Sequence, residues 1–245
     1  AEVMNLPDMI ELLKGYQALP SLHSAVATQN FRALSYFLFS PKSRYKAMGF
    51  DLPAKFRSCN ALHVAAAYDY SEICHSLLMS GATIDPIDDD GLTALDVAII
   101  GKSQNSAKIL FPFASPRVVA HAYFTAFDLK ADWVFDLGEK QKFEIGLIDR
   151  NGESLLIRLM KRTIGEVSPR ITEIKNTILK QSNPANKNDI IHHKDRYGAT
   201  AIHYACASPA TKTILQFKNS NIISQICYVK DNNGRFPLAY SIFFV

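Results

Sequence analysis

The segments Asn60-Ala61-Leu62-His63-Val64-Ala65-Ala66 and Asp88-Asp89-Asp90-Gly91-Leu92-Thr93-Ala94-Leu95-Asp96-Val97-Ala98 decide the fold of this 245-residue chain. Their leucines, Leu62 and Leu95, lie 33 residues apart. The same kind of helix start recurs in Leu22-His23-Ser24-Ala25 and in Ile202-His203-Tyr204-Ala205, and the lead-in Asp-x-x-Gly-x-Thr-Ala recurs from Asp195. A short unit that recurs at this period predicts an array of repeats, in which stacked neighbours bury apolar faces that one unit could not bury alone.

The period and the motif resemble those of the ankyrin-repeat family. The resemblance implies an all-α ankyrin-repeat solenoid of about six or seven units, several of them degenerate, joined by short hairpin loops. We therefore predict one array over residues 1–245, with the last unit incomplete. We call the motif leucine of each unit its anchor. The anchors are expected at Leu22, Leu62, Leu95, Val119, Leu156, Ile202 and Leu238.

A second helix is expected in each unit, about fifteen residues beyond the anchor, where apolar pairs stand. Gly81 fits the end of one such helix, because glycine adopts the left-handed conformation without a Cβ clash. Pro169 to Gln181 is predicted to be another, since Ile171, Ile174 and Ile178 recur at helical spacing and Ser168 fits its N-cap. The apolar pairs are Phe37-Leu38, Leu77-Leu78, Leu110-Phe111 and Val134-Phe135.

Composition and charge are those of a folded protein with an uneven charge distribution. Hydrophobic residues make up 48% of the chain, which is typical of a globular protein, and the formal net charge is +4. Residues 1–100 hold 7 Lys+Arg and 11 Asp+Glu, whereas residues 101–245 hold 20 and 12. A solvated surface and a bipolar docking face both account for this gradient. No apolar run is long enough to span a bilayer, so we expect no membrane insertion. We also expect a cytoplasmic location and a monomer.

Histidines and cysteines of the motif invite a catalytic interpretation, which we do not favour. In ankyrin proteins the motif histidine joins one repeat to the next by hydrogen bonds, and this role is expected of His23, His63 and His203. The four cysteines form no CxxC pair, and reduced thiols are expected. His192-His193 is expected in a solvated loop. We find no phosphate-binding loop, protease or hydrolase motif, and no Arg/Lys–aromatic interleaving typical of nucleic-acid readers. We therefore predict no catalytic residue, metal ligand or cofactor, and no nucleic-acid partner.

The resemblance implies a protein partner bound on the concave face, which is built from hairpin tips and the exposed side of the first helices. The residues at the corresponding positions are rich in Arg, Tyr and Phe, which dominate interface energetics. The alternative is that they are ordinary loop residues. We expect the contact to centre on Phe56, Arg57, Tyr68 and Asp90. The full set of expected contact residues is Phe56, Arg57, Tyr68, Asp89, Asp90, Leu92, Arg150, Asn151, Glu153, Arg162, Arg196, Tyr197, Asn232, Asn233 and Arg235.

These observations favour a non-catalytic protein–protein interaction module. Two alternatives stay open: the substrate-recruiting scaffold of a larger enzyme whose catalytic domain lies outside these residues, and an enzyme site within residues 115–146. The chain is rich in Ile, Asn, Lys, Phe and Tyr, and its repeats have uneven insertions. In this it resembles the ankyrin effectors that intracellular bacteria deliver into host cells, which would imply a virulence role in the host cytosol. A cytosolic eukaryotic adaptor is the other interpretation.

Overall fold

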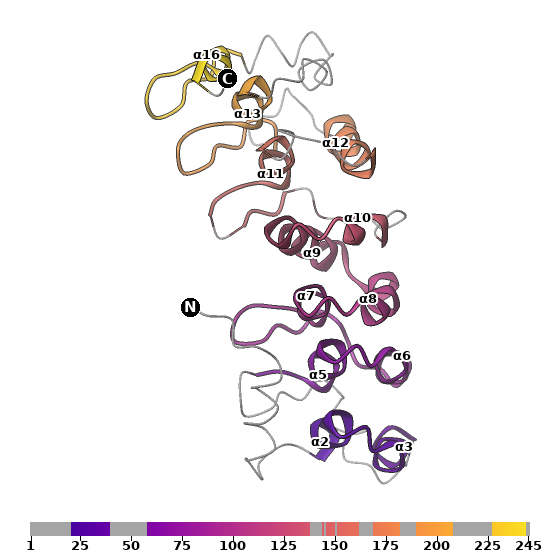
Figure 1. Cartoon of the computed structure of the whole chain (residues 1–245). Coiled ribbons are helices and arrows are strands. Elements are labelled where there is room, and N and C mark those ends of the chain that lie inside the picture. The colour runs from indigo at the N-terminus through magenta and orange to yellow at the C-terminus, as the bar shows by residue number, and fades with distance from the viewer. Residues whose placement is uncertain are drawn as a thin grey trace. The chain divides into compact units, whose positions relative to one another are not determined.

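The computed structural model describes residues 21–39, 58–137, 144, 146–149, 151–161, 169–181, 190–207 and 227–243. These residues form helices and loops, with two isolated β-bridges and no strand among them. The chain divides into two compact units (Figure 1). Unit 1 comprises residues 1–125 and 140–142, and unit 2 comprises residues 126–139 and 143–245.

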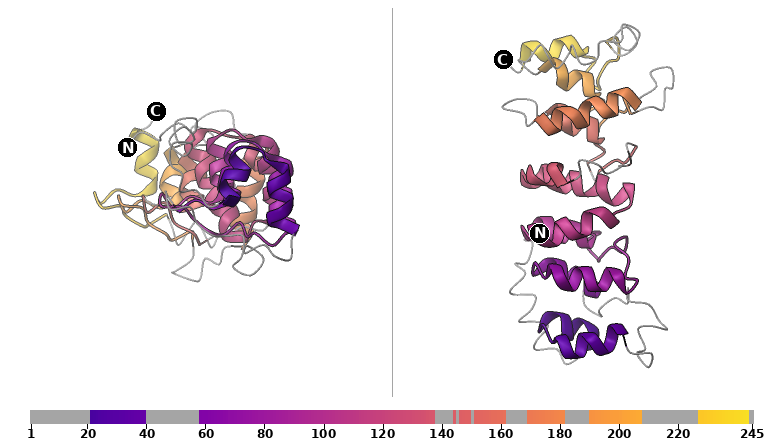
Figure 2. Two further views of the ribbon diagram at one scale, coloured as in Figure 1. Left: turned by 90° about the horizontal axis from the view of Figure 1, so that it is seen from below. Right: turned by 90° about the vertical axis from the view of Figure 1, so that its right-hand side faces the viewer.

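Unit 1 consists of helix pairs followed by a short helical turn. The first helices α2, α5 and α7 pack on one another, and α6 packs on α8, so that the pairs form successive layers (Figure 1 and Figure 2). The pairs are α2 (Ser21–Ala27) with α3 (Phe31–Phe39), α5 (Ala61–Ala67) with α6 (Ser71–Met79), and α7 (Ala94–Ile100) with α8 (Gln104–Leu110). The turn is the 3₁₀ helix η1 (Phe111–Phe113), after which α9 (Pro116–Leu129) begins in unit 1 and ends in unit 2.

Local sequence explains where these short helices begin and end. Asn60 and Thr93 are N-caps whose side-chain oxygens accept the backbone N–H three residues on, which satisfies a donor that the helix leaves open. Helix α6 ends at Met79 with Ser80 as its C-cap, and Gly81 follows with φ +101°, so the predicted glycine terminator is confirmed. The N–H of Gly81 bonds to the Leu78 carbonyl and that of Ala82 to the Leu77 carbonyl, both at 3.0 Å.

Unit 2 repeats the arrangement with a less regular start. Helix α13 packs between α11 and α16, and α12 packs against α10 and α11. The predicted helix from Pro169 to Gln181 is confirmed with those bounds, while the expected N-cap Ser168 lies outside the described residues. The helices are α10 (Trp133–Leu137), α11 (Leu155–Lys161), α12 (Pro169–Gln181), α13 (Ala201–Ala207) and α16 (Pro237–Phe243).

The anchors mark the core of both units. All but the last are at most 1% exposed, because each is covered by the helices of its own and neighbouring repeats. Leu238 on α16 is 73% exposed, and no second helix that would pair with α16 follows within the described residues. The buried anchors are Leu22, Leu62, Leu95, Val119, Leu156 and Ile202.

Candidate functional site

Four hairpins, which precede α7, α11, α13 and α16, share one turn. In the first of them the Asp88 carboxylate accepts the N–H groups of Asp90 and Leu92 at 3.0 and 2.8 Å, and the N–H of Gly91 bonds to the Asp88 carbonyl. Gly91 has φ +74°, which only glycine adopts without strain. The same bonds form around Asp149, Asp195 and Asp231, with Gly152, Gly198 and Gly234 at φ between +73° and +76°. The turn is therefore held by the aspartate, which is buried in three hairpins and half-buried at Asp149, and by the backbone, independently of the tip side chains.

In unit 2 the second oxygen of each hairpin aspartate also accepts a bond, from a residue nine positions further along. Arg158 bonds to Asp149, and the hydroxyls of Tyr204 and Tyr240 donate to Asp195 and Asp231 at 2.6 and 2.9 Å. Burial raises the pKa of Tyr240 to about 12, with a further contribution from its bond to Asp231. These bonds connect each hairpin to the first helix of its own repeat.

The motif histidines join successive repeats, as the sequence predicted. Each Nε2 donates to a backbone carbonyl of the next repeat: His23 to Cys59 and His63 to Leu92, both at 3.0 Å, and His203 to Arg235 at 3.4 Å. Burial lowers the pKa of His23 to about 4 and also lowers that of His203. Neutral, buried histidines bonded to carbonyls are structural links between repeats.

In the repeat of Leu95 the histidine position holds Asp96, and the direction of the bonds is reversed. The buried Asp96 carboxylate accepts from the N–H and hydroxyl of Thr93, and from His121 at 2.8 Å and Thr125 at 2.7 Å. His121 and Thr125 lie on α9, so the following helix supplies the donors that a histidine would supply elsewhere. The sequence analysis did not identify these two residues as a link.

The expectation of a solvated loop at His192-His193 needs a correction. His193 is half-buried, and its Nε2 donates to the Gly152 carbonyl at 2.8 Å, so it joins two repeats although it lies outside the histidine motif. Cys74 and Cys206 are not activated thiols, because burial raises the pKa of Cys74 to about 12 and that of Cys206 to about 11. Within the described residues no group of His, Cys, Asp or Glu could hold a metal ion.

The predicted contact residues fall into distinct environments. Tyr68 and Leu92 are half-buried, and Tyr68, at the far end of α5 from the hairpin side, stacks on Tyr70 with ring centroids 5.1 Å apart. Glu153 is buried and pairs with Arg158 and Lys161. Arg235 is half-buried and pairs with Asp231. Phe56, Arg57, Arg150 and Arg162 lie outside the described residues. The exposed members are Asp89, Asp90, Asn151, Arg196, Tyr197, Asn232 and Asn233.

The structure brings one subset of these residues together. The Asn232 N–H donates to the Tyr197 carbonyl at 3.0 Å, and its side-chain amide donates to the Arg196 carbonyl at 3.2 Å. The hairpins before α13 and α16 are thus tied at their tips. In unit 1, the Ser58 hydroxyl donates to Asp89 at 2.6 Å.

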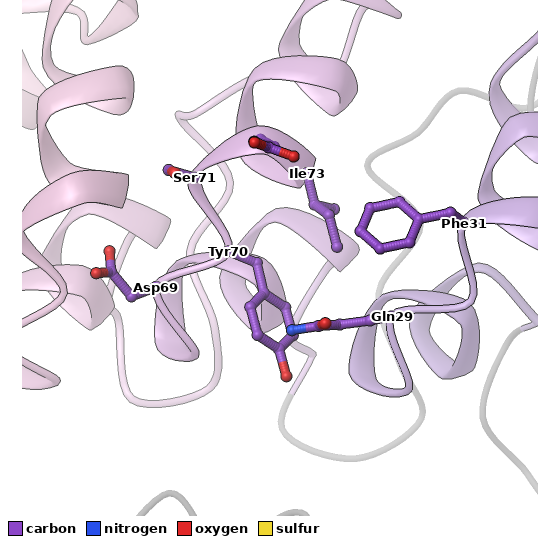
Figure 3. Close-up of a pocket in the computed structure, with 7 residues that line it drawn as sticks. Gln29, Phe31, Asp69, Tyr70, Ser71 and Ile73 are labelled. Atoms are coloured by element: carbon purple, nitrogen blue, oxygen red, sulfur yellow. The ribbon is translucent and has the colours of Figure 1, made fainter.

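A hollow of about 220 Å³ lies between the α2–α3 turn and the α5–α6 turn (Figure 3). These turns follow the C-terminal ends of the first helices, whereas the hairpins precede their N-terminal ends. Phe31 and Ile73 face each other across the hollow, and Tyr70 and Gln29 form its lower border in this view. The repeat motif does not predict this hollow, because its lining residues occupy turn positions of different repeats. They are Gln29, Phe31, Asp69, Tyr70, Ser71, Glu72 and Ile73.

Paired short helices, hairpins with an Asp-x-x-Gly turn and polar links between repeats define an all-helical ankyrin-repeat solenoid fold. Residues 22–119 match the family model described as ankyrin repeats in three copies. This match covers less than half of the chain, and the structural neighbours show the same ankyrin-repeat fold. Ankyrin repeats generally mediate protein–protein interaction.

Solved structures similar to this chain are ankyrin-repeat domains of low sequence identity. The ankyrin-repeat domain of Bcl-3, a member of the IkappaB family, is 19% identical, with a TM-score of 0.58 over 89% of this chain and 92% of that one. That of human ASB11 is 16% identical, with a TM-score of 0.53 over 91% of both chains. The ankyrin-repeat protein EF0377 is 16% identical, with a TM-score of 0.54 over 86% of this chain and 98% of that one. No curated protein matches the chain significantly in sequence. Within the described residues, no helix is both long and apolar enough to cross a membrane.

Proposed function

We propose that this chain is a non-catalytic module that binds a partner protein through its hairpin tips and the adjoining parts of its first helices. One observation carries the proposal. In each of the four hairpins the turn is held by a buried or half-buried aspartate and backbone bonds. The side chains between that aspartate and the glycine therefore do not hold the turn, and all of the described ones are exposed. A rigid turn that presents such side chains can bind a partner with little loss of conformational entropy.

The motif residues with reactive side chains support a binding role over catalysis. The histidines are buried and donate to carbonyls, and two of the cysteines have pKa values far above neutrality. A substrate-recruiting scaffold of a larger enzyme is the alternative function, and it would use the same surface. Comparison of the activity of the full-length gene product with that of this chain distinguishes the two.

The bacterial-effector hypothesis rests on composition and on the uneven insertions of the repeats. It proposes a host protein as the partner and the host cytosol as the place of action. A translocation reporter fused to the full-length gene product, expressed in an intracellular bacterium, tests it. A reporter signal that stays inside the bacterium contradicts the effector role and leaves the binding function intact.

Affinity capture from a eukaryotic cell lysate tests the binding surface. The tip variant combines Asp90→Lys in unit 1 with Arg196→Glu in unit 2, so its net charge is unchanged. The matched control combines Glu72→Lys on α6 with Lys180→Glu on α12; both positions are exposed and lie on second helices. We expect partners captured by the wild type to be lost with the tip variant and retained by the control. Equal capture by both variants would contradict a binding surface at the hairpin tips.

A further inference from the structure

The hairpins before α13 and α16 combine buried carboxylates with exposed cations. Asp195 and Asp231 are the only acidic residues in segments 194–199 and 230–236, and they are 6% and 5% exposed. Their oxygens accept bonds from their own turns and from Tyr204, Tyr240 and Arg235. Both carboxylates are therefore bonded within the fold and are not presented at the tips, and the Lys161 ammonium lies 3.6 Å from the Asp195 carboxylate.

Three cations of the same segments, Lys194, Arg196 and Lys230, are exposed. Among the described residues, none of the three forms an ion pair with a carboxylate. The hairpin of unit 1 has the opposite character, since residues 85–92 contain four aspartates, three of them exposed, and no cation. The tips of unit 2 are thus positive because of which charges are buried, an effect that the overall charge of the chain does not reveal.

An aromatic ring lies beside a cation on each of the two hairpins. The Arg196 guanidinium lies 4.8 Å from the ring centroid of Tyr197, and the Lys230 ammonium lies 4.8 Å from that of Phe236. The rings are 48% and 41% exposed. Each cation is ordered by its ring before any partner arrives, which reduces the entropy lost on binding.

The two cation–aromatic pairs are held at a fixed separation. Lys194 Nζ donates to the Lys230 carbonyl at 3.1 Å, in addition to the two bonds from Asn232 to the carbonyls of Arg196 and Tyr197. Gly198 has no side chain where Asn232 approaches, and a Cβ there would lie 2.8 Å from the Asn232 nitrogen. The hairpins therefore form one surface, which we name the basic–aromatic tip and define as Lys194, Arg196, Tyr197, Lys230 and Phe236.

We infer that the basic–aromatic tip binds an acidic segment of the partner protein, with carboxylates on Arg196 and Lys230 and an apolar side chain between them against Tyr197 and Phe236. This inference rests on the proposed function and specifies the chemistry of the partner. A nucleic acid fits less well, because three cations neutralise few phosphates and a cation already covers one face of each ring.

Fluorescence anisotropy on the full chain tests the inference with defined probes. The acidic probe is a labelled peptide in which glutamate alternates with serine around one central phenylalanine. The neutral probe replaces each glutamate by glutamine. We expect the acidic probe to bind at least about tenfold more tightly than the neutral one, with an affinity that falls as salt is added. Equal affinity for both probes would overturn the inference.

A pair of variants locates the site. Arg196→Gln with Lys230→Gln removes two cations of the tip, and Lys130→Gln with Lys180→Gln removes two exposed cations elsewhere in unit 2. We expect the first variant to weaken binding of the acidic probe about tenfold and the second to change it by about twofold or less. Equal weakening by both would attribute binding to net charge and overturn the assigned site.

Two further outcomes separate this inference from the proposed function. If lysate partners depend on the hairpin tips but the acidic probe binds no better than the neutral one, the binding function stands and the acidic partner is wrong. If a single-stranded DNA of mixed sequence binds more tightly than the acidic probe and loses affinity with Arg196→Gln and Lys230→Gln, the tip is a nucleic-acid site and the inference fails.

Discussion

Units 1 and 2 use the same helical register but place different side chains two residues beyond the anchor. In the unit 1 repeats of Leu62 and Leu95 these positions hold Val64 and Val97, whereas in the unit 2 repeats they hold Arg158, Tyr204 and Tyr240. The unit 2 residues donate to the hairpin aspartate of their own repeat, and valine offers no donor. One backbone arrangement therefore accepts an apolar or a polar residue at this position. The choice determines whether a hairpin is attached to its helix by side-chain bonds.

The side chains that link successive repeats also differ along the chain. A histidine donates to the next repeat at His23 and His63 in unit 1 and at His203 in unit 2, whereas Asp96 accepts from α9. Since a buried carboxylate costs more to desolvate than a neutral imidazole, Asp96 depends more strongly on its donors. The comparison predicts that the polar links contribute unequally to stability.

The largest effect is expected for Asp96→Ala. This change removes the acceptor for the buried hydroxyl of Thr93 and for the half-buried side chains of His121 and Thr125. We expect a loss of about 3–5 kcal/mol in the free energy of unfolding, measured by urea denaturation. Hydrogen exchange should accelerate in α7 and α9 more than in α13 and α16, because stability in a repeat array is set by nearest neighbours.

Asp90→Ala, at an exposed position in the hairpin that precedes α7, serves as the control for Asp96→Ala. We expect it to change the free energy of unfolding by no more than about 0.5 kcal/mol. If Asp96→Ala cost no more than this control, the reversed link would carry no stability, and the proposed difference between the histidine and aspartate links would be wrong.

The second effect is expected for Arg158→Met, which gives this repeat the apolar character that the repeats of Leu62 and Leu95 have at the same position. The guanidinium bonds to Asp149, Asp128 and Glu153, and the pKa of Arg158 is raised because bonds to the carboxylates outweigh burial. Its loss leaves partly buried carboxylates without their main partner, and we expect destabilisation by about 2–3 kcal/mol in urea denaturation. Arg196→Met, at an exposed tip, should change stability by about 0.5 kcal/mol or less. Equal values for the two would show that hairpin attachment adds nothing in unit 2.

Sequence reasoning predicted the parts of the fold that follow from repetition. The helix Pro169–Gln181 and its bounds follow from local physics, and the anchors and histidine links follow from a motif. The links through His121 and His193 could not be predicted in this way. They join residues 25 and 41 positions apart, outside any recurring pattern, so only the folded chain brings them together.

A constant spacing of nine residues separates each hairpin aspartate of unit 2 from its side-chain donor, and this spacing could have predicted the bonds. Arg158 donates to Asp149, Tyr204 to Asp195 and Tyr240 to Asp231. The placement of Glu153 could not be read from its loop position, because its burial depends on Arg158 and Lys161. The expected contact residues remain a prediction. The charge gradient of the sequence indicated a basic C-terminal half, whereas the burial of the carboxylates of Asp195 and Asp231 could not be read from it.

The third effect is a pH dependence that differs between the units. The folded-state pKa of His23 is about 4, below the ordinary value of 6.5, because burial disfavours the charged ring. As pH falls from 6.5 towards 4, the unfolded state binds a proton that the folded state does not, so stability is lost over this window. Between pH 7 and pH 5 we expect His23 to account for a loss of about 2 kcal/mol in the free energy of unfolding.

His23→Gln should therefore reduce the slope of stability against pH in this window. His203→Gln in unit 2 should reduce it less, because the bond to Arg235 and the carboxylates of Asp231 and Asp195 oppose the effect of burial on the pKa of His203. Urea denaturation at a series of pH values measures both slopes. A larger change for His203→Gln than for His23→Gln would contradict the difference.

The smallest effect concerns a cation in the core of unit 2. Lys175 lies on the apolar face of α12 with only 1% of its surface exposed, at the register position that Cys74 fills on α6 in unit 1. Burial lowers the pKa of Lys175 from its ordinary value of 10.5. At neutral pH the buried charge is destabilising, and the cost declines as pH rises from the lowered pKa to 10.5, where the unfolded state retains the proton longer.

We expect Lys175→Met, which conserves volume and removes the charge, to raise the free energy of unfolding by about 1 kcal/mol at pH 7. The gain should shrink at alkaline pH, whereas a gain from better apolar packing alone would persist there. Lys180→Met, on the exposed side of the same helix, should change stability by about 0.5 kcal/mol or less at either pH. A loss of stability in Lys175→Met would mean that the ammonium group has a stabilising role in α12, and that the charged residues of unit 2 are structural there as well as in its hairpins.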